Sequence, residues 1–316
     1  MLEESLKQKT KSLEEVLVRE DIIKESLPMY DITVQDNHNY FIKASEDLSL
    51  LSHNCLEFVV HEIIGPVVVV SRTTSLKPEL RIVKTGITWK VSKLWTYSIS
   101  NMLKCKAKNE LIVNHVIEDL KTHPCIIIPT DRTEHLQVLR NMVNDRAIKE
   151  GLISRSDFIA YPFFGGMSSK DKKDVLEKVD NGKCRVLVSM RSMIKQGIDL
   201  KIPTMLYSII PETATKEAGS PMFLQLSNRP CTPHLNKKQP IVKIFVDETD
   251  LSYACFKSLF SKEIKPNLTP NANNNFTARY ILPDEFKKIA YELMTKKADQ
   301  IQQKPGFFSR NYYNKS

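Results

Sequence analysis

Three consecutive residues, His53, Asn54 and Cys55, have side chains that together could break a peptide bond. An asparagine side chain can attack its own backbone carbonyl, which forms a succinimide and cuts the chain after the asparagine. A neighbouring histidine can assist as a general acid near neutral pH, and a thiol on the next residue could first accept an acyl group as a thioester. His38, across an expected hairpin, could donate or accept a proton. The tripeptide by itself is more typical of an ordinary loop than of a splice site.

A longer pattern surrounds the tripeptide. Its blocks are Tyr30-Asp31-Ile32-Thr33-Val34, His38-Asn39-Tyr40-Phe41 and Leu51-Ser52-His53-Asn54-Cys55. In order and spacing they resemble the C-terminal splicing blocks of an intein, over about residues 13–55. The resemblance implies a small all-β Hint-type segment in which Asn54 cyclises and His53 and His38 assist. It also implies that Cys55 accepts the acyl group and that Asp31 steers the transfer.

An intein also requires an N-terminal half, which begins with a nucleophilic Cys or Ser and contains a Thr-x-x-His block. Nothing before Tyr30 matches that half. We therefore expect a second polypeptide to supply it in trans, or the reading frame to be a fragment of a longer gene. The chain alone is expected not to splice.

From about Cys125 onwards, apolar strand-like runs alternate with helical patterns. The expected strands are 126–129, 158–161, 185–189, 204–210 and 241–246; the expected helices are 134–151, 168–180, 221–228, 251–260 and 284–297. Ser168 is the expected N-cap of the second helix, with Asn181-Gly182 closing it. Strands alternating with helices of this length predict an α/β fold with a parallel sheet and helices on both faces.

The segments that connect these elements resemble a superfamily-2 helicase of the DEAD/DEAH type over roughly residues 57–250. The segments are EFVVHEIIGPVVVVSR (57–72), CIIIPTDRTEHLQVL (125–139), the Gly-Gly loop and helix of 163–190, RSMIKQGIDLKIP (191–203) and QLSNRP (225–230). Their order resembles a chain that leaves a first RecA-like domain and continues through the second. The implied domains are an intein end (1–54), a connector (55–105), a second RecA-like domain (106–262) and a polar extension (263–316).

The helicase resemblance implies two groups of site residues. Arg229 would stabilise the charge that develops on a transferred phosphoryl group, with Gln225, Asp199 and Gly197 in the same nucleotide cleft. A second group at strand ends would hold a nucleic-acid backbone without reading bases: Thr130, Arg132, Gly165, Gly166 and Ser189. Taken singly, an arginine such as Arg229 is more often a solvated charge, and a pair such as Gly165-Gly166 is more often a simple turn.

Several positions depart from the helicase pattern. A second arginine is common just after the first, but Cys231 and Thr232 stand there, and Met190 replaces a common threonine. We recognise neither a Gly-x-x-x-x-Gly-Lys-Ser/Thr loop nor the Asp-Glu box of a nucleotide site in the sequence. We therefore expect ATP and Mg²⁺ to bind only together with a missing first RecA-like domain.

Charge, cysteine content and the length of apolar runs indicate the kind of partner and the cellular compartment. The formal charge is +9, which favours DNA or RNA as a partner, although excess lysine also serves solubility. The six scattered cysteines form no C-x-x-C pair, so we expect no metal site and a reducing compartment. No signal peptide or bilayer-length apolar run is recognised, which predicts a cytoplasmic, nuclear or viral-factory protein without membrane contact.

Three readings of the whole chain remain. The first is the C-terminal piece of an intein-interrupted helicase, whose partner carries the N-terminal intein half and the N-terminal helicase domain. The second is a non-catalytic, basic nucleic-acid-binding fragment with a relic intein end. The third is a Hint-type autoprocessing protein of another kind, which leaves the helicase-like segments unexplained.

Overall fold

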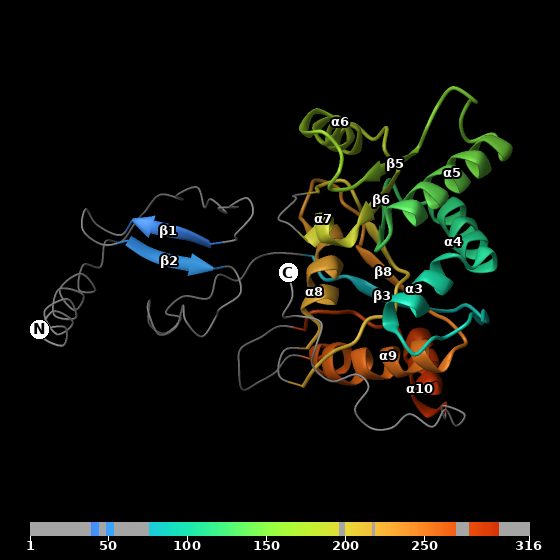
Figure 1. Ribbon diagram of the computed structural model, residues 1–316, viewed down its shortest axis with the longest axis vertical. Helices are drawn as coiled ribbons and strands as arrows, with labels where there is room; N and C mark the ends of the chain where they lie inside the picture. Colours follow the sequence, from blue (N-terminus) through green and yellow to red (C-terminus); the bar gives the residue numbers. More distant parts are fainter. Residues whose placement is uncertain are drawn as a thin grey trace, which may run out of the picture. The chain divides into compact units, whose positions relative to one another are not determined.

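The computed structural model describes residues 39–43, 49–53, 76–195, 200–216, 219–269 and 278–296. The chain divides into two compact units, residues 1–70 and 71–316 (Figure 1). No helix among the described residues is long and apolar enough to cross a membrane.

The first unit contains a β-hairpin. Strands β1 (Asn39–Lys43) and β2 (Ser49–His53) pair antiparallel, from Asn39 opposite His53 to Lys43 opposite Ser49. This two-stranded sheet is separate from the sheet of the second unit. The expected hairpin is present, whereas the Hint-type fold stays a prediction. Asp31, His38, Asn54 and Cys55 lie outside the described residues.

The second unit is built on a six-stranded parallel sheet in the order β3-β8-β7-β4-β6-β5. The strands are β3 (Glu79–Lys84), β4 (Ile126–Thr130), β5 (Ala160–Phe163), β6 (Val186–Met190), β7 (Met205–Ser208) and β8 (Ile241–Val246). All residues of the interior strands β4, β7 and β8 are buried. Burial on both faces explains their continuous apolar sequences, since parallel sheets are normally covered on both sides.

Helices cover both faces of this sheet, and each face has its own core (Figure 1). One core contains α3 (Trp95–Leu103), α4 (Lys106–Asp119) and α5 (Thr133–Lys149). The other contains α6 (Ser169–Asp180), α7 (Arg191–Lys195), α8 (Pro221–Ser227), α9 (Asp250–Leu259) and α10 (Asp284–Thr295). The predicted α/β class, parallel sheet and two helical layers are confirmed.

The second unit includes a strand before residue 106 and a helix after residue 262, outside the expected boundaries of the RecA-like domain. Strand β3, inside the expected connector, pairs with β8 along its whole length, and helix α10, inside the expected extension, packs on β3 and α9. Short helices η1 (Arg229–Cys231), η2 (Phe260–Ile264) and η3 (Lys265–Asn267) complete the unit. The core of the second unit thus includes residues from Leu80 to Leu293.

Local signals at the ends of two helices are confirmed. Ser168 caps α6 by accepting a hydrogen bond from the backbone N–H of Asp171 at 3.1 Å. Gly151 and Gly182 follow α5 and α6 with φ of +70° and +75°, a conformation that glycine adopts without steric cost. The two helices end at these glycines, and the chain continues to β5 and β6.

Candidate nucleic-acid interface at the carboxyl edge of the sheet

The carboxyl ends of all six strands meet at one edge of the second unit, because the strands are parallel. Thr130, Met190 and Phe163 end three adjacent strands, β4, β6 and β5. In open α/β sheets, ligands bind outside this edge. The segments that follow these strands are the ones in which the sequence predicts site residues.

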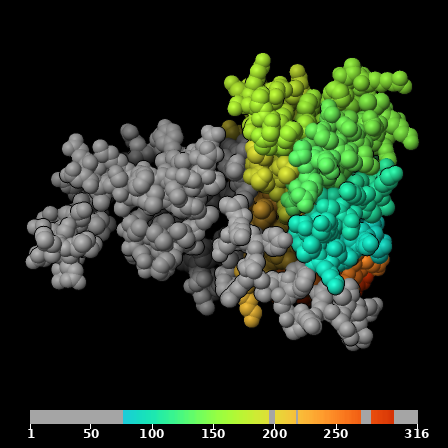
Figure 2. Space-filling view, viewed as in Figure 1, coloured from blue at the N-terminus to red at the C-terminus, as the bar shows by residue number. Residues whose placement is uncertain are grey.

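A groove of about 900 Å³ opens between the end of α3 and the starts of α4 and α5. Helix α4 packs on both α3 and α5, and the surfaces of these neighbouring segments adjoin in the space-filling view (Figure 2). The lining residues are Ser100, Leu103, Lys104, Lys106, Asn109, Glu110, Arg132, Thr133, Glu134, His135, Val138 and Met142. The groove is large enough for several atoms of an extended ligand backbone.

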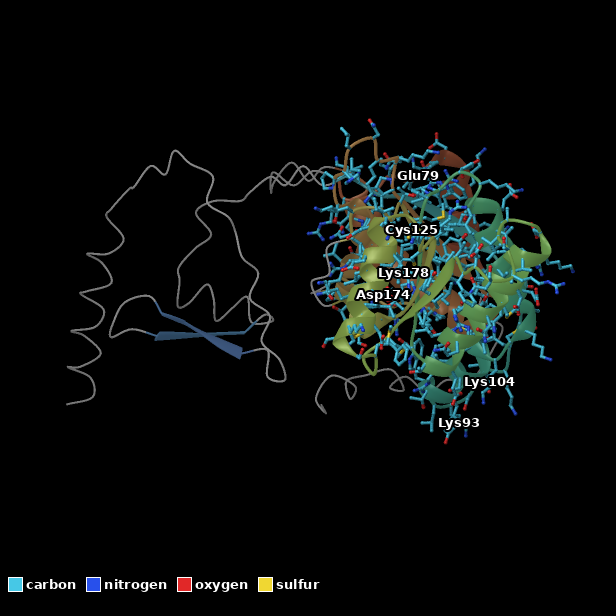
Figure 3. All side chains as sticks on the ribbon, turned by 90° about the horizontal axis from the view of Figure 1, so that it is seen from above. Glu79, Lys93, Lys104, Cys125, Asp174 and Lys178 are labelled. Carbon is cyan, nitrogen blue, oxygen red and sulfur yellow. The ribbon has the colours of Figure 1, made fainter. Side chains whose placement is uncertain are left out.

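Positive charge dominates the accessible walls of the groove. Lys104, Lys106 and Arg132 are exposed, and Lys104 lies at the surface in Figure 3. Glu110 is already paired with Arg146 at 2.8 Å, so the three cations outweigh the remaining Glu134. This balance suits a polyanion.

The start of α5 adds backbone donors to the groove. Arg132 is the N-cap residue, and no side chain caps the helix there. The first N–H groups of a helix lack partners within the helix, and the helix dipole favours negative charge at this end. An uncapped start between basic side chains is a site at which a phosphate group can bind.

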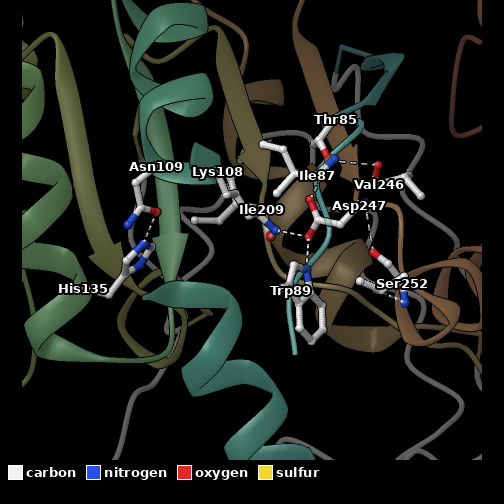
Figure 4. A network of polar contacts seen from close by, with 11 residues as sticks. Thr85, Ile87, Trp89, Lys108, Asn109, His135, Ile209, Val246, Asp247 and Ser252 are labelled. Atoms are coloured by element: carbon white, nitrogen blue, oxygen red, sulfur yellow. Dashed lines mark hydrogen bonds and ion pairs between the residues drawn. The ribbon is translucent and has the colours of Figure 1, made fainter. Parts of the chain in front are cut away.

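Thr130 lies beneath this surface. Its side chain is fully buried, and its Oγ1 lies 2.8 Å from Nδ1 of His135. The other ring nitrogen of His135 lies 3.0 Å from Oδ1 of Asn109 (Figure 4). Burial, and then the charge of Lys108, lower the pKa of His135 to about 4, so the imidazole is neutral at pH 7. This chain of contacts joins β4, α5 and α4 below the groove.

A buried ion pair supports the same edge. Nζ of Lys108 lies 2.5 Å from Oδ2 of Asp247, and the two side chains are 1% and 0% exposed. Lys108 also donates to the carbonyl of Ile209 at 2.8 Å, while Asp247 accepts from Trp89 Nε1 at 2.8 Å and from Thr85 Oγ1 at 2.9 Å (Figure 4). These contacts hold α4 against the ends of β3, β7 and β8. Burial lowers the pKa of Lys108, and Asp247 opposes this shift.

A third cluster spans the ends of β4 and β6. Arg191 donates from Nε to Asp131 at 2.5 Å, and from its terminal nitrogens to Asp131 and Glu212. The Arg191 side chain is 14% exposed. Burial alone would lower the pKa of Arg191, but Glu212 and Asp131 raise it. The guanidinium of Arg191 is therefore already bound by two carboxylates. These contacts hold the start of the 191–203 segment in place.

The other predicted site residues lie in different environments. Ser189 is fully buried, with its hydroxyl 3.1 Å from the carbonyl of Met190. Gly165 and Gly166 are exposed after β5, and a Cβ built on Gly165 would lie 3.8 Å from Sδ of Met193. The Gly-Gly loop therefore approaches α7, whereas Thr130 and Ser189 reach no open surface.

Of the four residues that the sequence predicts in a nucleotide cleft, the structure describes two. Gln225 lies on α8, which packs on α7, and its buried Oε1 has no hydrogen-bond partner within the described ranges. Arg229 begins η1 directly after α8 and is partly buried. Gly197 and Asp199 lie outside the described residues. Gln225 and Arg229 are therefore close in the chain and beside α7, but their predicted roles stay predictions.

Sequence patterns alone did not indicate Lys108, Arg191 or Asp247 as important residues. The Asp247-Glu248 dipeptide follows β8 directly and looks like the Asp-Glu box of a nucleotide site. In the structure, both carboxylate oxygens of Asp247 serve the internal network of Lys108, Trp89 and Thr85. Within the described part of the chain, no cluster of three or more His, Cys, Asp or Glu could hold a metal ion.

Comparisons with known proteins give a fold likeness only. No family model and no curated protein matches the chain. The Mycobacterium smegmatis helicase Lhr bound to ssDNA and AMP-PNP is 15% identical, with a TM-score of 0.42, over 65% of this chain and 23% of that one. Dbp5 of S. cerevisiae bound to RNA and ADP BeF3 is 11% identical, with a TM-score of 0.40, over 69% of this chain and 45% of that one.

The isolated C-terminal domain of the DEAD-box protein Dbp5 is matched over almost its whole length. It is 12% identical, with a TM-score of 0.40, over 70% of this chain and 98% of that one. This chain spans less than half of the longer Lhr and Dbp5 structures. At this level of likeness, no activity is transferred from these proteins.

Proposed function

We propose that the second unit is the second RecA-like half of a superfamily-2 nucleic-acid motor, which hydrolyses ATP only together with a first RecA-like domain. One observation carries the proposal. The helicase-like segments 125–139, 163–190 and 191–203 leave adjacent strands at a single edge of a parallel sheet, beside a basic groove. These segments are far apart in the sequence, and the parallel sheet brings them to the same edge, where they could bind one ligand.

In the proposed complex, the groove binds the sugar–phosphate backbone of DNA or RNA. Lys104, Lys106 and Arg132 contact phosphates, and the uncapped start of α5 supplies backbone donors. These contacts do not read bases, so binding is independent of sequence and sensitive to salt. Thr130 and Ser189 position this surface from below, and the Gly165-Gly166 loop extends it beside α7.

The nucleotide would bind between this unit and the first RecA-like domain. Arg229 would contact the transferred phosphoryl group, with Gln225, Gly197 and Asp199 around it. The buried Oε1 of Gln225, which has no hydrogen-bond partner among the residues that the structure describes, supports a role for α8 in an assembly with further groups, because buried acceptors normally have partners. ATP and Mg²⁺ would be held mainly by the first domain, since the sequence carries no phosphate-binding loop of its own.

The test of this division of labour is an ATPase assay. The purified chain with Mg²⁺-ATP and single-stranded DNA or RNA is expected to hydrolyse no ATP above background. Joined to a polypeptide that carries a first RecA-like domain, it is expected to become a nucleic-acid-stimulated ATPase. Arg229→Ala should then reduce the rate by about 10³-fold or more, which is the usual contribution of such an arginine.

The exposed Arg155 provides the matched control for this assay. Arg155→Ala removes the same side chain from the segment between α5 and β5, outside the segments of the proposed cleft, and is expected to leave the rate unchanged. Robust nucleic-acid-stimulated hydrolysis by the isolated chain would refute the proposal that a first domain is required. Unchanged activity of the joined Arg229→Ala protein would remove Arg229 from the mechanism.

We also propose that the first unit is the C-terminal end of an intein that splices at Asn54 and Cys55. The register of the hairpin supports this proposal. Asn39 lies opposite His53, so the chain enters β1 and leaves β2 at the same end of the hairpin. In the sequence, His38 directly precedes Asn39 and Asn54 directly follows His53. This arrangement suits proton transfer between the two blocks.

The purified chain is expected to stay at full length, because only the C-terminal splicing blocks are recognised in its sequence. After mixing with a matching N-terminal intein half, mass spectrometry should find a ligated product whose new half begins at Cys55. Asn54→Ala should block its release, while Asn141→Ala, an exposed asparagine of α5, should not. Rapid spontaneous release of a fragment beginning at Cys55 from the chain alone would be the contrary result.

A further inference from the structure

A second basic cavity lies at the amino edge of the sheet, opposite the groove. It encloses about 380 Å³ between the residues that lead into β4, β6, β7 and β8. These segments are 120–124, Arg185, 201–204 and 234–238. Cys125, which directly precedes β4, lies well away from Lys104 in Figure 3. The cavity is therefore separate from the proposed nucleic-acid groove.

The lining of this cavity is strongly positive. Its fourteen residues include no aspartate or glutamate, and the basic ones are Lys121, Arg185, Lys201, Lys237 and Lys238. Lys121 forms an exposed pair with Glu118, which itself does not line the cavity. Cations gathered from four separate segments without a carboxylate among them form a local excess of positive charge.

Backbone carbonyls hold three of these cations in place. Nζ of Lys238 lies 2.6 Å from the carbonyl of Thr122, and Nζ of Lys237 lies 2.8 Å from that of Lys201. Arg185 donates to the carbonyls of Leu120 and His123. A carbonyl orients a cation but does not cancel its charge, so Arg185 and Lys238 are held in place and keep a positive charge that can attract an anion.

His123 shows the effect of this positive environment. It is 9% exposed, and its Nδ1 lies 3.0 Å from Oγ1 of Thr204. Burial lowers the pKa of His123; Asp119 opposes the shift, and Arg81, Lys238 and Lys243 lower the pKa further. Three cations therefore act on the residue that lies at the inner wall of the cavity.

We propose that this cavity binds a small molecule that carries two or more phosphate groups. The volume is at the lower end of the range for small-molecule sites. Several cations converge from different segments, which suits a ligand with several charges better than a single phosphate. Leu120, Ile202 and the 83% exposed Leu235 add apolar walls for the part of the ligand that bears the phosphates. The proposal does not depend on the motor function.

The test is isothermal titration of the full chain with tripolyphosphate at fixed ionic strength. We expect saturable binding of one molecule per chain. Lys201 and Lys238 are exposed, so the double variant Lys201→Gln/Lys238→Gln should fold. Its affinity for tripolyphosphate should be lower than that of the wild type by about tenfold or more. The matched control, Lys104→Gln/Lys106→Gln, removes the same charge from the groove and should bind tripolyphosphate like the wild type.

A second variant and a competitor complete the test. Lys201→Glu alone should also weaken binding, and its thermal unfolding midpoint should equal that of the wild type. The proposal is overturned if no saturable binding is found, or if the groove variant, and not the cavity variant, loses it. Orthophosphate binding as tightly as tripolyphosphate, or displacement of tripolyphosphate by a single-stranded oligonucleotide, would overturn it as well.

Discussion

Lys108→Met is expected to lower the free energy of unfolding by about 3–5 kcal/mol, as measured by urea denaturation at pH 7. The variant keeps much of the side-chain volume but removes the cation that faces Asp247. Asp247 is 0% exposed, so its carboxylate would lose its countercharge and keep, among the described residues, Trp89 and Thr85 as side-chain donors. An uncompensated buried charge is among the largest destabilising changes that a single substitution produces.

Two further variants separate this effect from simple loss of packing. Lys108→Met/Asp247→Asn removes both charges while the amide oxygen can still accept from Trp89, so it should recover a large part of the lost stability. Lys121→Met breaks an exposed pair, 58% and 70% accessible, and should leave the urea midpoint unchanged. A Lys108→Met protein as stable as the wild type would show that the pair does not hold α4 to the sheet.

Stability is expected to fall by about 3 kcal/mol between pH 6.5 and pH 4 because of His135 alone. Its pKa is lowered from the ordinary value of 6.5 to about 4. In this window the unfolded chain binds a proton at His135 and the folded chain does not. The contribution is therefore fully present above pH 6.5 and is lost as the pH falls through the folded pKa.

The measurement compares urea denaturation of the wild type and His135→Gln across this pH range. Glutamine keeps a polar contact with Asn109 but does not titrate, so the variant should be less stable at pH 7 and depend less on pH. His115 and His123, whose pKa values burial also lowers, remain in both proteins and cancel in the difference. Equal pH dependence of the two proteins would show that His135 does not titrate as described.

The elements that the sequence predicts best are the buried ones with uninterrupted patterns. Strand β8 has six consecutive buried residues, and its predicted bounds, 241–246, coincide with the observed ones. Strand β3 was missed because it is an edge strand, in which only Leu80 and Ile82 are fully inside. Helix α4 was missed because its buried face includes Lys108 and Asn109, which break the apolar pattern.

For the candidate site too, the sequence predicts some features and not others. Order along the chain was enough to bring the segments after β4, β5 and β6 together, because a parallel sheet collects its strand ends at one edge. It could not show that Thr130 is fully buried while Arg132, two residues later, is exposed, since the chain turns from strand to helix between them. Nor could it pair Lys108 with Asp247, which are 139 residues apart.

The central claim, that the carboxyl edge of the sheet binds a nucleic-acid backbone, is tested most directly by single-stranded oligonucleotide binding. Fluorescence anisotropy with DNA and RNA should show binding that weakens steeply with salt. The variant Lys104→Gln/Lys106→Gln/Arg132→Gln should lose affinity on the order of 10- to 100-fold at 0.1 M salt, and its salt slope should fall by about 2.

The amino-edge variant Lys201→Gln/Lys238→Gln, which removes charge from the opposite side of the same sheet, should bind the oligonucleotides with nearly wild-type affinity. That pair of results would place the contact at the groove. If the groove variant binds with unchanged affinity and salt slope, or if the amino-edge variant loses binding instead, the carboxyl edge is not the nucleic-acid interface and the proposed motor function fails with it.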